Sequence, residues 1–253
     1  MFFYSAQKVV WLTLIAMSLR SECWANSPHK FQMQAAILRE EGNTLEALHL
    51  YNCAIVGYQQ EHNYKGILES LCGRLISWQH LFNQEEDMVY AILARQEAEA
   101  MLRIAQLYAI QDKDYLIHFL FGKSAIFLKD FAEAEKEFRA AIELYPDANA
   151  EKGDWLAHLG EAIFRNGSKE EGILTILQGI EYIESHACGI DSFRINVWIS
   201  GAYLRLAKIL IIDGNLEEAR IYLQKGEEIV LQDPRLVIRM QQLENLREKI
   251  LTL

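Results

Sequence analysis

Seven histidines and four cysteines are the side chains of this sequence best suited to metal binding or nucleophilic chemistry. The histidines are nowhere three or four residues apart, the spacing that puts two imidazoles on one helix face as metal ligands. No CxxC pair, glycine-rich phosphate loop, HExxH or GxSxG motif occurs. The sequence therefore predicts no catalytic residue, no metal site and no cofactor, and we expect a protein that is not an enzyme. The histidines are His29, His49, His62, His80, His118, His158 and His186.

The composition indicates a folded, helical protein. Of 253 residues, 51% are hydrophobic and 24% are charged, as in soluble globular domains. Only 14 Gly and 3 Pro occur, well below average usage of roughly 12% for the two together, so few residues can end a helix. The formal net charge of -10 would repel the phosphates of nucleic acid. We therefore expect long helices and no nucleic-acid binding.

Residues 1–25 resemble a targeting segment. Lys8 precedes an eleven-residue apolar run from Val9 to Leu19, and a signal peptide could be cleaved after Ala25. The run is too short to span a bilayer, which needs about twenty residues. We expect export to a secreted or periplasmic location, or an N-terminal hydrophobic anchor if the segment is retained. The alternative is the first helix of a cytoplasmic protein.

The cysteines weigh against an oxidising compartment. Cleavage after Ala25 would leave an odd number, Cys53, Cys72 and Cys188, whereas exported proteins usually pair their cysteines. All three lie inside helical patterns. We interpret them as small buried hydrophobic residues.

An internal repeat is the strongest pattern in the chain. From Gly122 the pattern continues with Ala134 twelve residues on, Phe138 four later, Ala141 three later and Pro146 five later. Antiparallel helices approach closely only where small residues remove bulk, so this spacing predicts a helical pair with a large residue packed beside the crossing. Four more copies follow the same spacing less closely. In the five copies together, the small residues of the first helices are Ala35, Gly73, Gly122, Gly160 and Ala207, at intervals of 38, 49, 38 and 47 residues.

Two copies depart from the pattern. In the second, 25 residues separate Gly73 from Ala98, so we expect longer helices, a turn near Asn83 and Gln84, and a second helix packed through Ala98, Leu102 and Ala105. The fourth has glycines at 160, 172 and 179 where alanine is usual. Each helix-interior glycine costs about 1 kcal/mol relative to alanine. We therefore predict that the fourth copy is the least stable.

Residues 28–232 thus resemble a tetratricopeptide-repeat (TPR) protein with about five repeats and extended helices. A capping helix at 233–253 is predicted to start with Asp233 as N-cap and Pro234 at its first position. The resemblance implies an all-α, right-handed solenoid of antiparallel helix pairs whose first helices form a concave, peptide-binding face. It implies a non-catalytic scaffold or adaptor that binds protein or peptide. The alternative is a peptide-responsive regulator whose superhelix changes conformation on binding.

The residue after each key small residue, with those four before and after it, is expected on the concave face. Basic residues outnumber Glu40 and Glu161 at these places, in a chain that is acidic overall. We therefore predict an acidic peptide or a chain-end carboxylate as partner, with aromatic rings holding apolar anchors; the alternative is that the rings are core and the charges a solvated face. The candidate groove residues are Arg74, Trp78, Lys123, Phe127, Arg165, Arg205 and Lys208.

The family includes members that clamp a chaperone's terminal carboxylate with Lys and Asn. Those places hold Gln32, Ala36 and Arg74 in this sequence. Binding to heat-shock chaperone tails is therefore not expected.

Overall fold

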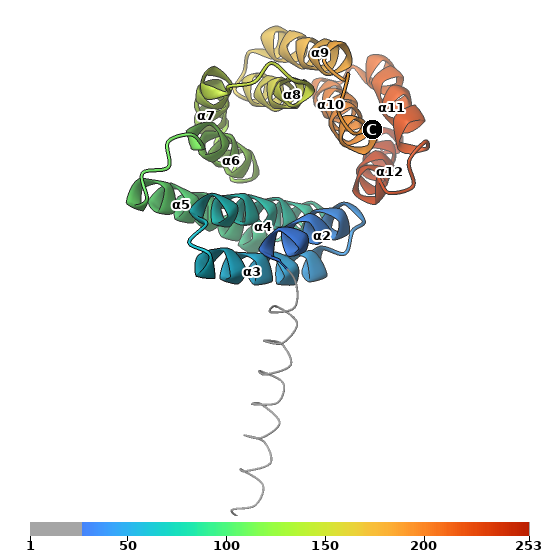
Figure 1. Ribbon diagram of the computed structural model, residues 1–253. Helices are drawn as coiled ribbons and strands as arrows, with labels where there is room; N and C mark the ends of the chain where they lie inside the picture. The colour runs from blue at the N-terminus through green and yellow to red at the C-terminus, as the bar shows by residue number, and fades with distance from the viewer. Residues whose placement is uncertain (1–26, 253) are drawn as a thin grey trace, which may run out of the picture.

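Residues 27–252 are described by the computed structural model and form α-helices without a strand (Figure 1). Helices α2 to α11 form five consecutive antiparallel pairs, each an A helix followed by a B helix, and α12 follows them. This arrangement confirms the predicted all-α repeat fold. The predicted signal peptide or anchor, residues 1–25, lies outside the described residues. The helices are α2 Pro28–Glu40, α3 Thr44–Gln60, α4 Tyr64–Glu85, α5 Met88–Leu107, α6 Asp114–Phe127, α7 Phe131–Leu144, α8 Ala150–Arg165, α9 Lys169–Ser185, α10 Ser192–Asp213, α11 Leu216–Val230 and α12 Val237–Leu251.

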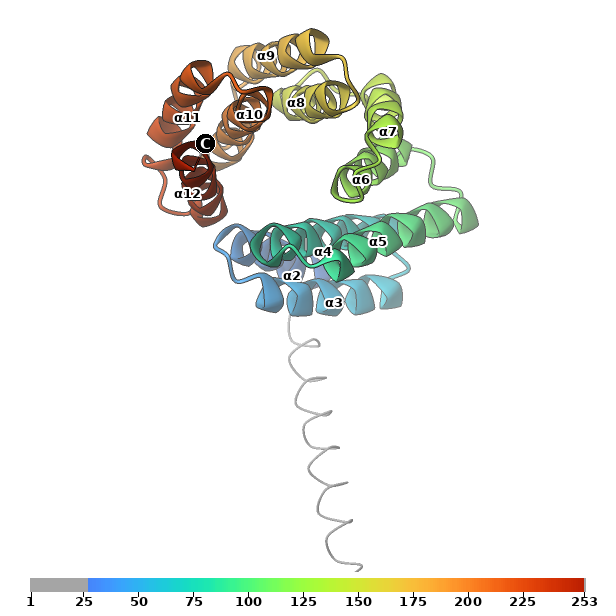
Figure 2. The same ribbon diagram turned by 180° about the vertical axis from the view of Figure 1, so that it is seen from behind.

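The pairs follow a curve that almost closes on itself (Figures 1 and 2). Helices α4, α6, α8, α10 and α12 lie on the inner side, while α3, α7, α9 and α11 lie outside. At the closure α12 reaches the first two pairs. The Gln84 side-chain amide on α4 donates a hydrogen bond of 3.2 Å to Gln241 on α12. Val237 lies against the turn after α2, since a Cβ atom at Gly42 would be 3.6 Å from its Cγ1.

Turn chemistry sets most helix boundaries. The side chains of Asn63, Asp130 and Asn215 each accept a backbone N–H in the first turn of α4, α7 and α11. In the second copy the turn, at Glu86 and Asp87, falls three residues later than predicted. Helix α4 runs to Glu85, Glu86 adopts a left-handed conformation, and Asp87 accepts from Val89 N to start α5. Long helices of 22, 20 and 22 residues, α4, α5 and α10, contribute to the two widest intervals.

Glycines of the fourth copy allow the closest helix contact. A Cβ atom on Gly160 would lie 2.6 Å from the carbonyl oxygen of Gly172, and one on Gly153 would lie 2.5 Å from that of Gly179. The backbones of α8 and α9 therefore touch directly at two crossings. From helix propensity we predicted that these glycines weaken the fourth copy, whereas in the structure they allow α8 and α9 to pack closely.

The second copy has a different register from the one predicted. Both glycines of α4 face the preceding B helix: Gly66 faces Tyr58 and Gly73 faces Tyr51. On α5, Met101 is fully buried and Leu102 is 36% exposed, so Met101 takes the core position expected for Leu102. A small residue fits against either neighbouring B helix, so spacing alone could not decide the register.

The C-terminal helix starts later than predicted. The Asp233 carboxylate accepts from the Arg235 backbone N–H at 3.1 Å and from its guanidinium at 2.7 Å. These bonds hold residues 233–236 in a turn, which Leu236 N closes by donating to Asp233 O. The helix therefore begins at Val237, with Asp233 and Pro234 preceding it.

One described helix, α10, has the length and hydropathy of a membrane span. Its most apolar window is 61% buried inside the protein, where Leu206, Ile209 and Leu210 belong to the C-terminal core. Packing against neighbouring helices accounts for this composition. Of the cysteines, Cys53 is buried in the N-terminal core and Cys72 is partly buried, whereas Cys188 is exposed in the loop before α10 and corrects the prediction for that residue.

Candidate functional site

Charged and imidazole side chains from six helices gather on the inner side of the solenoid. Their charges act on one another across helices: the pKa of Lys123 on α6 responds to Asp154, Arg205 and Arg239, and that of His80 on α4 responds to Glu40 and Lys123. Five members are basic and three acidic, so with neutral imidazoles the set is net positive in a chain of net charge -10. We call it the interior cluster: Arg39, Glu40, His80, Lys123, Asp154, His158, Glu161, Arg205, Lys208 and Arg239.

Capping interactions fix the helices that carry this cluster. The side chain of Asn149 accepts from Glu151 N at 3.0 Å, and the Tyr145 hydroxyl donates to the Glu151 carboxylate at 2.8 Å. Together these bonds set where α8 begins and hence where Asp154 projects. The Asp191 carboxylate accepts from Arg194 N at the start of α10 in the same way.

A buried carboxylate joins two cations between α8 and α10. Glu161 accepts from Lys208 Nζ at 2.8 Å and from Arg205 Nη1 at 3.1 Å. Although burial opposes ionisation, the charges of Lys208 and Arg205 hold the pKa of Glu161 at about 2. Arg205 also contacts His158 Nε2 at 2.8 Å. Burial, aided by Arg205, lowers the pKa of His158 well below its usual value, so the imidazole is neutral and accepts this bond.

Two opposite charges near this network lack direct partners. Lys123 forms no ion pair with any described residue, and its ammonium lies 5.5 Å from the centre of the Phe119 ring. Burial, opposed by the charge of Asp154, lowers the pKa of Lys123 to about 8. No described residue donates a hydrogen bond to the Asp154 carboxylate, whose nearest basic atom is His158 Nε2 at 3.8 Å. These groups remain available to a ligand.

Arg74 and Trp78 are not brought into the interior cluster. The Arg74 guanidinium forms a 2.6 Å ion pair with Glu97 on α5, and the Trp78 indole donates to the same carboxylate at 3.2 Å. Trp78 also stacks on Tyr90 of α5. Because Gly73 faces α3, these residues, which follow it along α4, face α5 instead of the inner side.

The remaining candidates are divided. Lys123, Arg205 and Lys208 belong to the interior cluster. Phe127 packs edge-to-face on Phe82 of α4, with ring centres 4.8 Å apart. Arg165 lies over the Phe131 ring at 4.6 Å, near enough to Glu161 to help lower its pKa.

Several interior residues were missed by sequence reasoning. Asp154, His158 and Glu161 follow an i, i+4, i+7 spacing on one face of α8, a signal that could have revealed Asp154 and His158. Arg239 belongs to the helix that we interpreted as a terminal cap. Its inward position depends on the closure of the curve, which no local pattern shows.

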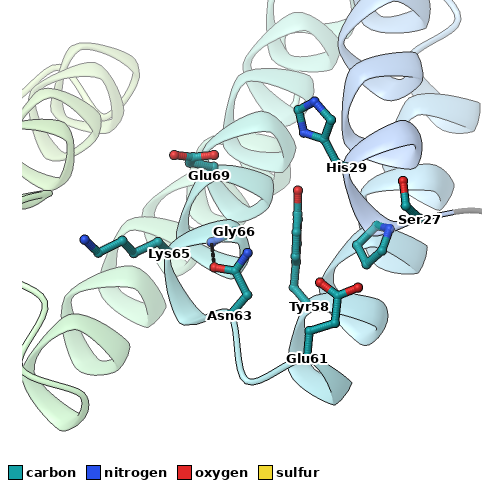
Figure 3. Close-up of a pocket in the computed structure, with 9 residues that line it drawn as sticks. Ser27, His29, Tyr58, Glu61, Asn63, Lys65, Gly66 and Glu69 are labelled. Carbon is teal, nitrogen blue, oxygen red and sulfur yellow. Dashed lines mark hydrogen bonds between the residues drawn. The ribbon is translucent and has the colours of Figure 1, made fainter.

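An open pocket of about 400 Å³ lies between the start of α2, the end of α3 and the start of α4. Figure 3 shows the residues that line it. Two of the pocket's polar side chains are engaged by residues outside its lining. Tyr58 donates to Gln32 at 2.6 Å, and the Glu69 carboxylate accepts from Lys113 at 2.9 Å. It contains no member of the interior cluster. A second pocket lies between α11 and α12.

The described residues contain no group of His, Cys, Asp and Glu arranged to hold a metal.

Comparisons with known proteins agree with this architecture. Residues 115–148 and 200–229, within the third and fifth pairs, match the tetratricopeptide repeat family. No curated protein matches the chain. The solved structure of BtubC (BKLC) from P. vanneervenii is similar over 90% of this chain and 91% of that chain, with 14% identity and a TM-score of 0.54. That of MamA protein is similar over 83% and 95%, with 15% identity and a TM-score of 0.41.

The chain is thus a solenoid of helical pairs with a TPR-like fold. More particularly, residues 115–148 and 200–229 match tetratricopeptide repeats. Tetratricopeptide repeats commonly mediate protein–protein interactions, generally as non-catalytic scaffolds.

Proposed function

We propose that this protein is a non-catalytic scaffold or adaptor that binds an acidic protein segment or peptide on its inner face. One observation carries the proposal: the inner helices concentrate positive charge in an acidic chain, and the ammonium of Lys123 has no carboxylate partner among the described residues. A partner carboxylate would supply the missing acceptor. Hydrogen bonds to charged groups contribute about 1.5–3 kcal/mol each.

Affinity capture with matched charge reversals tests the proposal. The wild-type protein, Lys123→Glu and Lys136→Glu would each be used to capture partners from an extract of the source cells. Lys136 lies on the outer helix α7 with its side chain 80% exposed, so its reversal changes net charge equally without touching the inner face. We expect a protein retained by wild type and Lys136→Glu to be lost with Lys123→Glu. Equal retention by all three would refute inner-face binding.

The small contact between α12 and the first two pairs favours a second function, that of a peptide-responsive regulator. Within residues 27–252, α12 is held to the first two pairs by one hydrogen bond, between the exposed side chains of Gln84 and Gln241, and by the packing of Val237 on the turn at Gly42. Contacts of this kind contribute little free energy, so the curve can open and close at low cost. A regulator should change its radius of gyration in small-angle X-ray scattering when an acidic peptide is added. A scaffold should keep the same radius.

Export or N-terminal anchoring is a separate proposal, supported by the apolar run at residues 9–19. Sequencing the native protein from its N-terminus tests it. A start just after Ala25 would support export, and an intact N-terminus in a membrane fraction would support anchoring. An intact N-terminus in a soluble fraction would refute both.

A further inference from the structure

The C-terminal helix places an arginine in the interior cluster. Arg239 donates through Nε to the Val197 carbonyl on α10 at 3.2 Å and through Nη1 to Gln242 at 2.8 Å. Its Nη2 lies over Gly201, where a Cβ atom would be only 3.0 Å away. No carboxylate of the described residues forms an ion pair with Arg239. The guanidinium is thus held in place by α10 and α12 while Nη2 makes no hydrogen bond within the described chain.

The closure of the curve sets Arg239 opposite the second pair. The contact between Gln84 and Gln241 joins α12 to α4. His80, one turn before Gln84 on α4, is 8% exposed, and its Nδ1 atom has no hydrogen-bond partner in the described residues. Burying a polar group without a partner is unfavourable, so a ligand that hydrogen-bonds there is favoured. Helices α6 and α12 lie on either side of the interior next to α4 (Figures 1 and 2), and the charges of Lys123 on α6 and Arg239 on α12 both act on His80.

We propose that a carboxylate of an extended acidic partner segment is held between Lys123 of α6 and Arg239 of α12, so that the C-terminal helix forms part of the binding site. The inference rests on the proposed function and adds a position for the carboxylate. Lys123 and Arg239 supply the two cations of the interior cluster that form no ion pair, and His80 Nδ1, which has no hydrogen-bond partner in the described residues, can donate in the tautomer that carries its proton there. An acidic segment fits better than a basic one because the cluster is net positive.

A bound carboxylate would also link distant parts of the solenoid. Helix α6 belongs to the third pair, and α12 follows the fifth. Since few contacts hold α12 against α2 and α4, a ligand bridging Lys123 and Arg239 should reduce the opening motions of α12.

The probe for the test is N-acetyl-hexaglutamate, with hexalysine as the opposite charge, titrated calorimetrically into the full chain at low salt. We expect saturable binding of hexaglutamate alone. Lys123→Gln and Arg239→Met should each weaken it about tenfold or more, since each removes a hydrogen bond to a charged group. Arg247→Met is the matched control, because Arg247 also lies on α12 but pairs with Glu227 of α11. It should bind as wild type does.

The outcomes separate the two claims. If Lys123→Gln weakens binding but Arg239→Met and Arg247→Met both bind like wild type, the role of α12 is refuted and the proposed function stands. If wild type does not bind hexaglutamate, the proposed function falls as well. Hydrogen exchange of the wild-type protein needs no variant to fold: saturation with hexaglutamate should slow exchange in residues 237–251. Unchanged exchange there would overturn the inference.

Discussion

Replacing Gly160 with alanine gives opposite predictions from helix propensity and from packing. Helix propensity alone makes Ala more favourable than Gly by about 1 kcal/mol in a helix interior. In the structure, however, Gly160 lies where α8 crosses α9, and the added methyl group would lie 2.6 Å from the Gly172 carbonyl oxygen. We therefore expect Gly160→Ala to destabilise the protein.

The size of the effect follows from the distance. An ordinary contact for this methyl group begins at 3.4 Å, so α8 and α9 must separate by about 0.8 Å at the crossing. Besides Cγ1 of the Ile176 side chain, its nearest neighbours are Gly172 O and Ile176 N, backbone atoms of α9 that cannot rotate away as a flexible side chain would. Overpacking typically costs about 1–3 kcal/mol, and subtracting the propensity gain of about 1 kcal/mol leaves a net loss of up to about 2 kcal/mol.

Urea unfolding followed by circular dichroism measures the change, with Gly226→Ala as control. Gly226 is also a buried helical glycine, but a methyl group there would meet the end of the Leu204 side chain at 3.1 Å, and that chain can turn aside. We expect Gly226→Ala to be neutral or stabilising by up to about 1 kcal/mol. A Gly160→Ala protein more stable than wild type would refute the packing role and restore the sequence-based view of a weak fourth repeat.

Three further variants or conditions test the site. Glu161→Gln should cost about 2 kcal/mol or more in urea unfolding because it leaves Arg205 and Lys208 without their carboxylate; a change below about 0.5 kcal/mol would contradict the network. Trp78→Phe should cost about 1 kcal/mol through the lost bond to Glu97 and leave hexaglutamate affinity unchanged, whereas weaker binding would return Trp78 to the site. Burial lowers the pKa of His80 to about 3 from an ordinary 6.5, so acid favours the unfolded state, which binds the proton. Stability should fall as pH drops from about 6.5 toward 3, with a smaller fall in His80→Gln; an equal fall in both proteins would show that His80 is not responsible.

The helical pairs were predictable because their signals are local. Asn and Gly residues mark the turns, and small residues mark the helix crossing in the third pair. All the residues that define one pair lie within some thirty residues of one another. The fourth pair was also found, but the sequence could not show that its glycines bring two backbones into contact. Small residues recur at the same spacing in the sequence whether the two helices are separated by the width of an alanine side chain or touch through their backbones.

The interior cluster depended on information that no single repeat contains. Gly73 could face either neighbouring B helix, α3 or α5. Because it faces α3, Arg74 points toward Glu97 of α5. Arg239 reaches the interior only because extended helices and accumulated curvature bring α12 to α2 and α4. Lys123 lies on the inner side because in the third pair Gly122 faces its own B helix, at Phe138, as the spacing predicted.

The central claim is that the inner helices bind the partner. Hydrogen exchange of the wild-type protein with and without saturating hexaglutamate tests it most directly. Binding on the inner face should slow exchange in the inner helices α6, α8 and α10, at residues 114–127, 150–165 and 192–213, while the outer helices α7, α9 and α11 stay unchanged. Slower exchange confined to α7, α9 and α11 would contradict the account.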